Sequence, residues 1–177
     1  MTHWRKWPLL ALACLTLAAC GPRKPAIPAT VASGDGRCQV TLPIGWMQAR
    51  NLNDVAAIQA ADKNNEVYLI VVRDFKSDLG RPFTIHEHAQ LTLDRFLTAV
   101  ADPRIAGPVE MQINGRRAIR HEMTGILKSE NLKLTYLRTT VETDRAFYMV
   151  LAWTTADRFT RNRAVLEQAT AGFAELP

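Results

Sequence analysis

The sequence predicts an α+β fold, in which helices pack on an antiparallel sheet, and three observations lead to this class. Apolar runs with strand periodicity and two helical patterns follow one another in the order β-β-β-α-β-β-β-β-α. Asn114-Gly115 separates two of these runs, and this dipeptide marks a tight hairpin because both residues tolerate positive φ. Runs of hairpins with the helices placed late favour one antiparallel sheet over alternating parallel units.

The strands of this sheet are expected where apolar and β-branched residues gather. The run Val67–Val72 is continuously apolar, which suits a central strand covered on both faces. Thr143-Asp144 is expected to turn a second hairpin. About six to seven strands are predicted, over residues 38–42, 55–61, 66–75, 109–113, 116–127, 131–141 and 145–154.

Two main helices are expected beside the sheet. The first begins after Thr84, which can form a capping box with Glu87, and is expected to end at Asp102-Pro103. The second is predicted over 156–173, with Thr155 as its N-cap and apolar residues on one face.

The first 19 residues have the layout of a secretory signal peptide. Arg5 and Lys6 precede an apolar run over 9–17 that is too short to span a bilayer. The sequence Leu17-Ala18-Ala19-Cys20 resembles the bacterial lipobox. That resemblance implies cleavage between Ala19 and Cys20, a diacylglycerol on the Cys20 thiol, and an acyl chain on the new amino terminus. Several acyl chains anchor a protein stably.

The residues after Cys20 indicate location and domain boundaries. Gly21 follows the acylated cysteine, and by resemblance to enteric lipoproteins this implies the outer membrane of a Gram-negative bacterium, facing the periplasm. Residues 20–36, rich in proline and glycine, are expected to form a flexible tether. Residues 37–177 are expected to form one domain.

Charge and cysteine content restrict the function classes. The net charge of +5 is small and scattered, so no nucleic-acid partner is expected. Of three cysteines, Cys14 leaves with the signal and Cys20 is acylated. Cys38 is either a reactive thiol or, the favoured interpretation, a small buried residue at a strand start.

The histidines form no recognisable catalytic or metal-binding motif. His86-Glu87-His88-Ala89-Gln90 lacks the second histidine of a zinc-protease helix, and side chains two apart on a helix diverge by about 200°. A polar helix face is expected there, with no metal and no cofactor. His121 is expected to be half-exposed on a strand, with Glu122 on the opposite face.

Three aromatic residues are candidates for a partner or ligand surface. Trp46, Tyr136 and Trp153 lie on or beside predicted strands, and such residues are enriched at interfaces. Core packing with a hydrogen-bonded polar tip is the alternative. Trp46 follows a Pro-Ile-Gly turn, so it is the one expected to be partly exposed.

Four stretches together resemble the PsbP-like superfamily, named for an extrinsic photosystem II subunit. They are VTLPIGW (Val40–Trp46), EVYLIVVRDFKSDL (Glu66–Leu79), ING (Ile113–Gly115) and FYMVLAWT (Phe147–Thr154). The resemblance covers about residues 37–176 and implies an α/β/α sandwich with a central antiparallel sheet. The family includes bacterial lipoproteins and small chaperones of type VI secretion effectors, and it implies no shared catalytic residues.

Three functions are consistent with the sequence. The first is a non-enzymatic accessory module, anchored to the membrane through Cys20, that binds another envelope protein. The second is an immunity-type lipoprotein that neutralises a toxin in the periplasm. The third, a small-ligand binder or hydrolase, rests on the aromatic residues and Cys38 alone.

Overall fold

A computed structural model describes residues 27–177 of the chain. The expected signal peptide, the cleavage site Ala19-Cys20 and the lipidation of Cys20 lie outside the described residues. The strands are β1 (Ala29–Ala32), β2 (Cys38–Leu42), β3 (Met47–Gln48), β4 (Ile58–Asp62), β5 (Val67–Phe75), β6 (Val100–Ile113), β7 (Arg116–Leu127), β8 (Leu132–Glu142), β9 (Ala146–Thr155) and β10 (Phe173–Glu175). The helices are η1 (Lys76–Asp78), α1 (Ile85–Leu97) and α2 (Phe159–Ala171).

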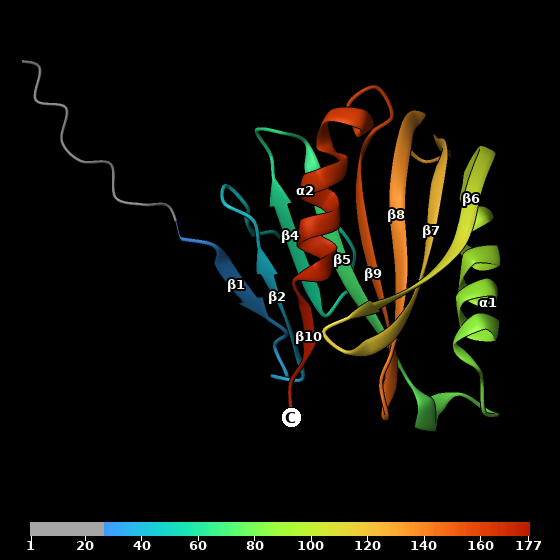
Figure 1. Ribbon diagram of the computed structural model, residues 1–177. Coiled ribbons are helices and arrows are strands. Elements are labelled where there is room, and N and C mark those ends of the chain that lie inside the picture. The colour runs from blue at the N-terminus through green and yellow to red at the C-terminus, as the bar shows by residue number, and fades with distance from the viewer. Residues whose placement is uncertain (1–26) are drawn as a thin grey trace, which may run out of the picture.

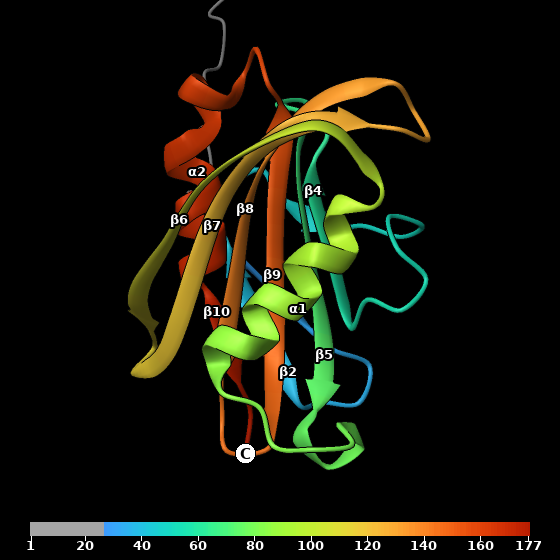
Figure 2. The same ribbon diagram turned by 90° about the vertical axis from the view of Figure 1, so that its right-hand side faces the viewer.

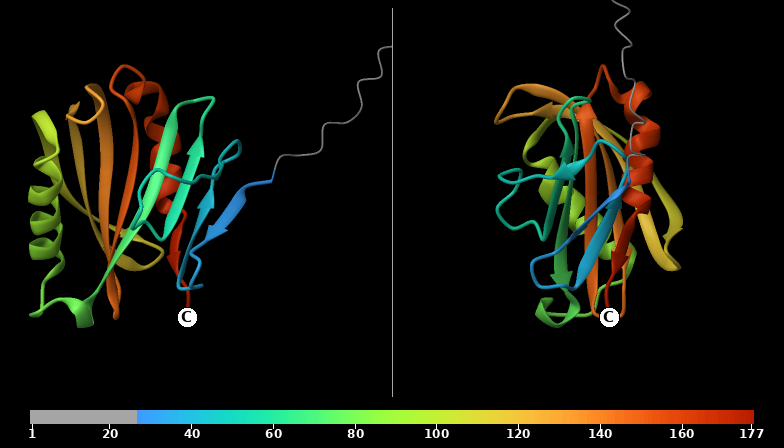
Figure 3. Two further views of the ribbon diagram at one scale, coloured as in Figure 1. Left: turned by 180° about the vertical axis from the view of Figure 1, so that it is seen from behind. Right: turned by 90° about the vertical axis from the view of Figure 1, so that its left-hand side faces the viewer.

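The architecture is the α/β/α sandwich with a central antiparallel sheet. Seven strands form the main sheet in the order β3-β4-β5-β9-β8-β7-β6, and β1-β2-β10 form a second, smaller sheet. Helix α1 covers one face of the main sheet, while α2 and the smaller sheet lie on the other (Figures 1 and 2). Figure 3 shows the same separation from behind. The predicted fold class is therefore confirmed.

The two sides of β5 and β9 enter different cores, as the continuous apolar run in β5 predicts. Val71 and its partner Val150 face the α2 side, in a cluster that also contains residues of β1, β2 and β10. Ile70 and its partner Leu151 face α1, together with Leu93. Burial on both faces explains why this segment lacks the polar alternation of a half-exposed strand.

The structure confirms one of the two predicted N-caps and contradicts the other. The capping box between Thr84 and Glu87 is present at the start of α1, with both reciprocal hydrogen bonds formed. The N-cap prediction for Thr155 is wrong, because β9 continues through Thr155, which pairs with Leu134. A turn follows, and α2 begins at Phe159, three residues later than the start expected at residue 156.

Strand β6 is longer than predicted. It begins at Val100 rather than at 109, and α1 ends at Leu97 rather than at Asp102-Pro103. The prolines do not interrupt it because β6 is an edge strand, where a missing N–H costs no ladder hydrogen bond. The pairing with β7 shifts register twice, between Ala101 and Arg104 and again between Ala106 and Val109.

Part of the predicted tether belongs to the folded domain, which corrects the boundary at residue 37. Residues Ala29–Ala32 form β1, and Ala29 pairs with Leu42 of β2. Val31 is only 8% exposed and packs in the α2-side core. The Ser33 hydroxyl accepts a hydrogen bond from the Cys38 N–H at 3.1 Å, which fixes the turn that follows. Because prolines and glycines flank this four-residue strand, the composition of the segment does not predict it.

One glycine is required where α2 meets the smaller sheet. The Thr41 N–H donates to the Gly172 carbonyl at 2.9 Å, and a Cβ on Gly172 would lie 2.0 Å from the Thr41 carbonyl oxygen. Because backbone atoms cannot move aside freely, the two segments must separate if residue 172 carries a side chain.

We therefore expect Gly172→Ala to lower the free energy of unfolding by about 1–3 kcal/mol, the usual cost of overpacking. Urea denaturation followed by circular dichroism measures this change. Gly80→Ala is the matched control, because nothing lies within 4 Å of its added Cβ. Equal effects of the two substitutions would contradict the packing argument.

Candidate functional site

The small sheet defines two ends of the molecule. At one end, Cys38 of β2 pairs with Glu175 of β10. At the other end, Leu42 of β2 pairs with Ala29 of β1, close to where the described chain begins. The C-terminus lies at the Cys38 end (Figure 1). These two ends differ in chemistry.

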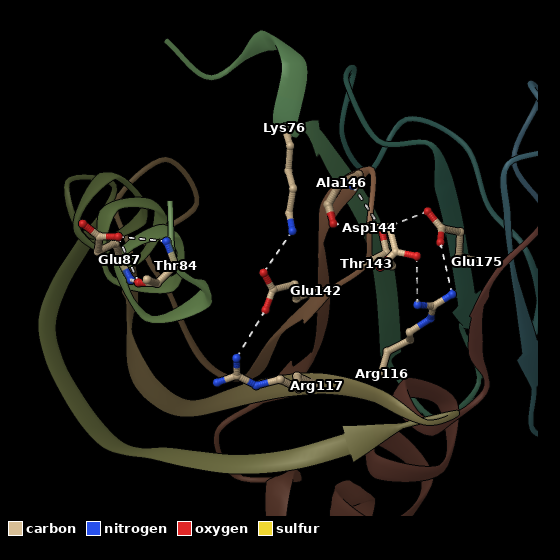
Figure 4. A network of polar contacts seen from close by, with 10 residues as sticks. All are labelled: Lys76, Thr84, Glu87, Arg116, Arg117, Glu142, Thr143, Asp144, Ala146 and Glu175. Carbon is tan, nitrogen blue, oxygen red and sulfur yellow. Dashed lines mark hydrogen bonds and ion pairs between the residues drawn. The ribbon is translucent and has the colours of Figure 1, made fainter. Parts of the chain in front are cut away.

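A network of charged side chains occupies the Cys38 end, as Figure 4 shows. Glu142 bridges two cations, with Oε1 3.0 Å from Lys76 Nζ and Oε2 3.7 Å from an Arg117 guanidinium nitrogen. Arg116 likewise lies between Asp144 at 3.6 Å and Glu175 at 3.9 Å. We call these six residues the end network: Lys76, Arg116, Arg117, Glu142, Asp144 and Glu175.

Two tight turns bring the end network together. Asn114 and Gly115 adopt φ of 48° and 78°, so the β6–β7 hairpin turns as predicted and places Arg116 and Arg117 directly after it. In the β8–β9 turn, the Thr143 hydroxyl accepts a hydrogen bond from the Ala146 N–H at 3.1 Å. The same hydroxyl lies 2.9 Å from Glu175 Oε1 and donates to it.

The charges of the end network are balanced, with three cations and three anions. The side chains of Arg116 and Arg117 are 45% and 65% exposed, so these pairs contribute little to stability and remain accessible. A site for phosphate or nucleic acid would concentrate one sign of charge. A balanced, exposed network instead matches the mixed polar rim of a protein-binding surface.

A groove opens beside the end network. It has a volume of about 450 Å³ and lies where the start of α1 faces the β6–β7 hairpin. We call it the end groove; its lining is Ile85, Glu110, Met111, Gln112, Arg117, Ala118 and Ile119. A second hollow of about 250 Å³ lies across Arg117, among the residues of the end network. Polar and charged side chains therefore dominate the surface of this end, with the partly buried Met111 among them.

A second polar cluster lies beneath α1, and it corrects the prediction of a polar helix face. His88 is 1% exposed, its Nε2 lies 2.9 Å from Asp74 Oδ2, and its ring stacks on Phe147 with 4.3 Å between centroids. The hydrogen bond from His88 lowers the pKa of Asp74, which keeps this carboxylate charged. His86, by contrast, is exposed and 2.9 Å from Glu110.

Arg138 of β8 joins the same cluster from the sheet. It is fully buried and donates to the Ala89 carbonyl at 3.2 Å and to the Thr92 hydroxyl, so it ties α1 to the sheet. Burial lowers the pKa of Arg138 to about 10, which leaves it charged at neutral pH. His121 pairs with Arg138 in register and is 3% exposed, so its predicted half-exposure is wrong.

This buried cluster is suited to holding α1 rather than to catalysis. Burial and the neighbouring Arg138 lower the pKa of His121, which favours its neutral form. The three serines of the described chain, Ser33, Ser77 and Ser129, lie outside the cluster, and Cys38 packs on the opposite side of the sheet. Over residues 27–177, no group of three or more His, Cys, Asp or Glu side chains is arranged to hold a metal ion.

The structure separates the three aromatic residues predicted as a surface. Trp46 is 4% exposed and packs in the α2-side core, because the Gly45 turn points the indole inward. Tyr136 is 3% exposed, beside Phe96 at 5.1 Å. Trp153 is half-buried and stacks on Tyr68 at 5.4 Å. Of the three, Trp153 alone reaches the surface.

Cys38 is a free, fully buried thiol, which agrees with the favoured interpretation of this residue. Desolvation raises its pKa, so the reactive thiolate is disfavoured. No sequence pattern identifies the end network in advance. Its Asn-Gly and Thr-Asp turns were recognisable, but the convergence of η1, two hairpins and the last residues depends on tertiary structure.

Sequence comparisons identify no relatives: no family model matches the chain, and no curated protein matches it. No helix within residues 27–177 is long and apolar enough to cross a membrane.

Solved structures show the fold. The solution structure of cyanobacterial PsbP (CyanoP) from Synechocystis sp. PCC 6803 is similar with a TM-score of 0.60 and 14% identity, over 90% of this chain and 99% of that one. LpqN of Mycobacterium tuberculosis, involved in cell envelope biogenesis, is similar with a TM-score of 0.60 and 13% identity, over 84% and 90% of the two chains. PA94 of Pseudomonas aeruginosa, described as a protein of unknown function and putative regulator, has a TM-score of 0.53 and 15% identity, over 85% and 99%. The fold is therefore PsbP-like.

The hydrogen bond between Asp74 and His88 makes the free energy of unfolding depend on pH. Because the folded pKa of Asp74 is lowered, its contribution is present above the unfolded pKa of about 3.9 and is lost as pH falls through the folded pKa. We expect Asp74→Asn to cost about 1 kcal/mol near pH 7, a modest value because the carboxylate is 42% exposed.

Thermal unfolding at pH 7, 5 and 3 measures this difference, which should shrink below about pH 4. Asp94→Asn is the control, since Asp94 is an exposed carboxylate on α1. A difference between wild type and Asp74→Asn that stays constant across this range would disprove the charged hydrogen bond.

Proposed function

We propose that this chain is a lipid-anchored accessory protein of the bacterial cell envelope that binds another envelope protein and catalyses no reaction. The observation that carries this proposal is the position of the end network, at the opposite end of β2 from the point where the described chain begins. An anchor at Cys20 would therefore hold the domain with the end network directed away from the membrane.

The composition of the end groove supports a protein partner. In the end groove, the partly buried Met111 lies among the charged side chains of Glu110 and Arg117, and Arg117 also lines the second hollow within the end network. This combination of a small apolar centre with a charged rim is typical of protein interfaces. A site for a small molecule would be more enclosed and more apolar.

The structural neighbours are compatible with this role. LpqN is described as involved in cell envelope biogenesis. The resemblance of the first 20 residues to a signal peptide with a lipobox supports the same compartment. We extend this to a periplasm-facing position on the outer membrane, for which Gly21 is the supporting residue.

Replacement of the anchoring cysteine tests the location. We expect Cys20→Ser to prevent maturation and to shift the protein out of the outer-membrane fraction, because the acyl chains supply the membrane affinity. Cell fractionation on a density gradient and intact mass of the mature chain measure both effects. Cys38→Ala is the matched control and should fractionate as wild type, since Cys38 is buried in the domain. Membrane partition unchanged by Cys20→Ser would refute the anchor.

Photo-crosslinking in intact cells tests the binding surface. A photo-reactive residue at Gln112, exposed in the end groove, should give a discrete adduct with an envelope protein. The same residue at Arg104, exposed on β6 away from the groove, should not. Arg117→Glu should reduce the Gln112 adduct on the order of tenfold by reversing a rim charge.

The outcome distinguishes the alternatives that the sequence leaves open. An adduct at Gln112 that survives Arg117→Glu, or adducts of equal strength at Gln112 and Arg104, would argue against the end groove as the interface. A discrete adduct whose partner is a secreted toxin would favour the immunity-type role instead.

A further inference from the structure

Three exposed apolar side chains gather at the end of the molecule opposite the end network. Ile27, Ile44 and Met47 are 83%, 59% and 64% exposed. Ile44 and Met47 follow Leu42, the residue that pairs with Ala29, so they lie beside the start of the described chain. We call these three residues the apolar corner. Single exposed apolar residues are ordinary, whereas several together on one corner mark a contact surface.

The loop that carries Ile44 is fixed by contacts between its next residues and the core. The Trp46 side chain is buried in the core, and the Trp46 backbone N–H donates to the Pro43 carbonyl at 3.3 Å. Gly45 has φ of 94°, and a Cβ there would lie 3.1 Å from an Asp62 oxygen. Ile44 is therefore turned outward by a fixed backbone conformation, so its exposure is a built feature of the fold.

Strand β1 sets how far this corner can lie from the bilayer. The folded domain begins at Ala29 rather than at residue 37, which removes about half of the spacer expected from composition. From Cys20 to Ile27 there are seven residue steps, and a fully extended chain of that length spans at most about 25 Å. A lipid on Cys20 would therefore keep the apolar corner near the membrane surface.

A cation lies next to the corner. Lys63 follows Asp62, the residue beneath Gly45, and is exposed, and among residues 27–177 it forms no ion pair. Apolar side chains flanked by lysine are the combination that inserts at the boundary between acyl chains and anionic headgroups.

We propose that the apolar corner rests on the bilayer in which Cys20 is anchored, so that the domain is oriented on the membrane as well as attached to it. This inference rests on the proposed anchoring. Its occupant is the lipid of the anchoring leaflet, because the chain reaches the corner directly from the lipidated residue. The end network then points into the periplasm as a consequence of contact at the other end.

Fluorescence quenching by brominated lipids tests this orientation in the lipidated full chain. Met47→Cys, labelled with an environment-sensitive fluorophore, is reconstituted in phosphatidylethanolamine and phosphatidylglycerol vesicles with bromine on the acyl chains. Cys38 is buried and does not compete for the label under native conditions. We expect quenching on the order of twofold relative to unbrominated vesicles, because the probe enters the acyl boundary.

Val109→Cys is the matched control. Val109 is 58% exposed on β6, the edge of the main sheet opposite β3, so its probe should not be quenched. Ile44→Asp in the Met47-labelled protein should reduce the quenching toward the Val109 level. The substitution is on the surface, so flotation and unfolding of the domain should stay unchanged.

The possible failures are distinguishable. Flotation with vesicles and an unquenched Met47 probe would overturn this inference while leaving the anchor intact. A Met47 probe that is shielded from iodide in water yet unquenched by brominated lipid would mean that protein covers the corner, and would also overturn it. Failure of the full chain to float would overturn both proposals.

Discussion

The burial of β5 and β9 on both faces is the constraint on which the rest of the structure depends. Their paired residues supply one core beneath α1 and a second beneath α2 and the smaller sheet. A strand covered on both sides must be apolar throughout, and it must lie near the centre of its sheet. Both helices, and the separation of the two ends, follow from the position of this central pair.

On the α1 side of the main sheet, burial extends to polar and charged side chains. There the apolar layer is interrupted by Arg138, His88 and His121, all nearly or fully buried. A buried guanidinium needs hydrogen bonds, and α1 provides one to each terminal nitrogen of Arg138, through the Ala89 carbonyl and the Thr92 hydroxyl. The position of α1 is therefore specified by polar groups as well as by packing. The buried Asn162 has the same role in α2, because it donates to the Asn65 carbonyl and to the Thr154 hydroxyl.

Sequence reasoning succeeded where local chemistry decides the outcome. The capping box at Thr84 and the turn at Asn114-Gly115 depend on neighbouring residues only, and both are present. It failed for β1 and for the early part of β6, where proline and glycine suggested loops but pairing with β2 and β7 formed strands. The burial of His88 and Trp46 was missed for the same reason, since each depends on elements distant in the chain. The end network joins residues from positions 76 to 175, a convergence that no local pattern encodes.

The irregular path of β6 has a consequence for how copies of the molecule behave when crowded. Its outer edge contains Pro103 and Pro108, positive φ at Asp102 and Gly107, and two shifts of register. A flat edge would offer a neighbouring chain an uninterrupted row of N–H and C=O groups, the starting point of edge-to-edge aggregation. Here that row is broken at two places, so a second sheet cannot extend this one along its full length. The longest edge of the molecule is thereby protected against polymerisation without a covering element.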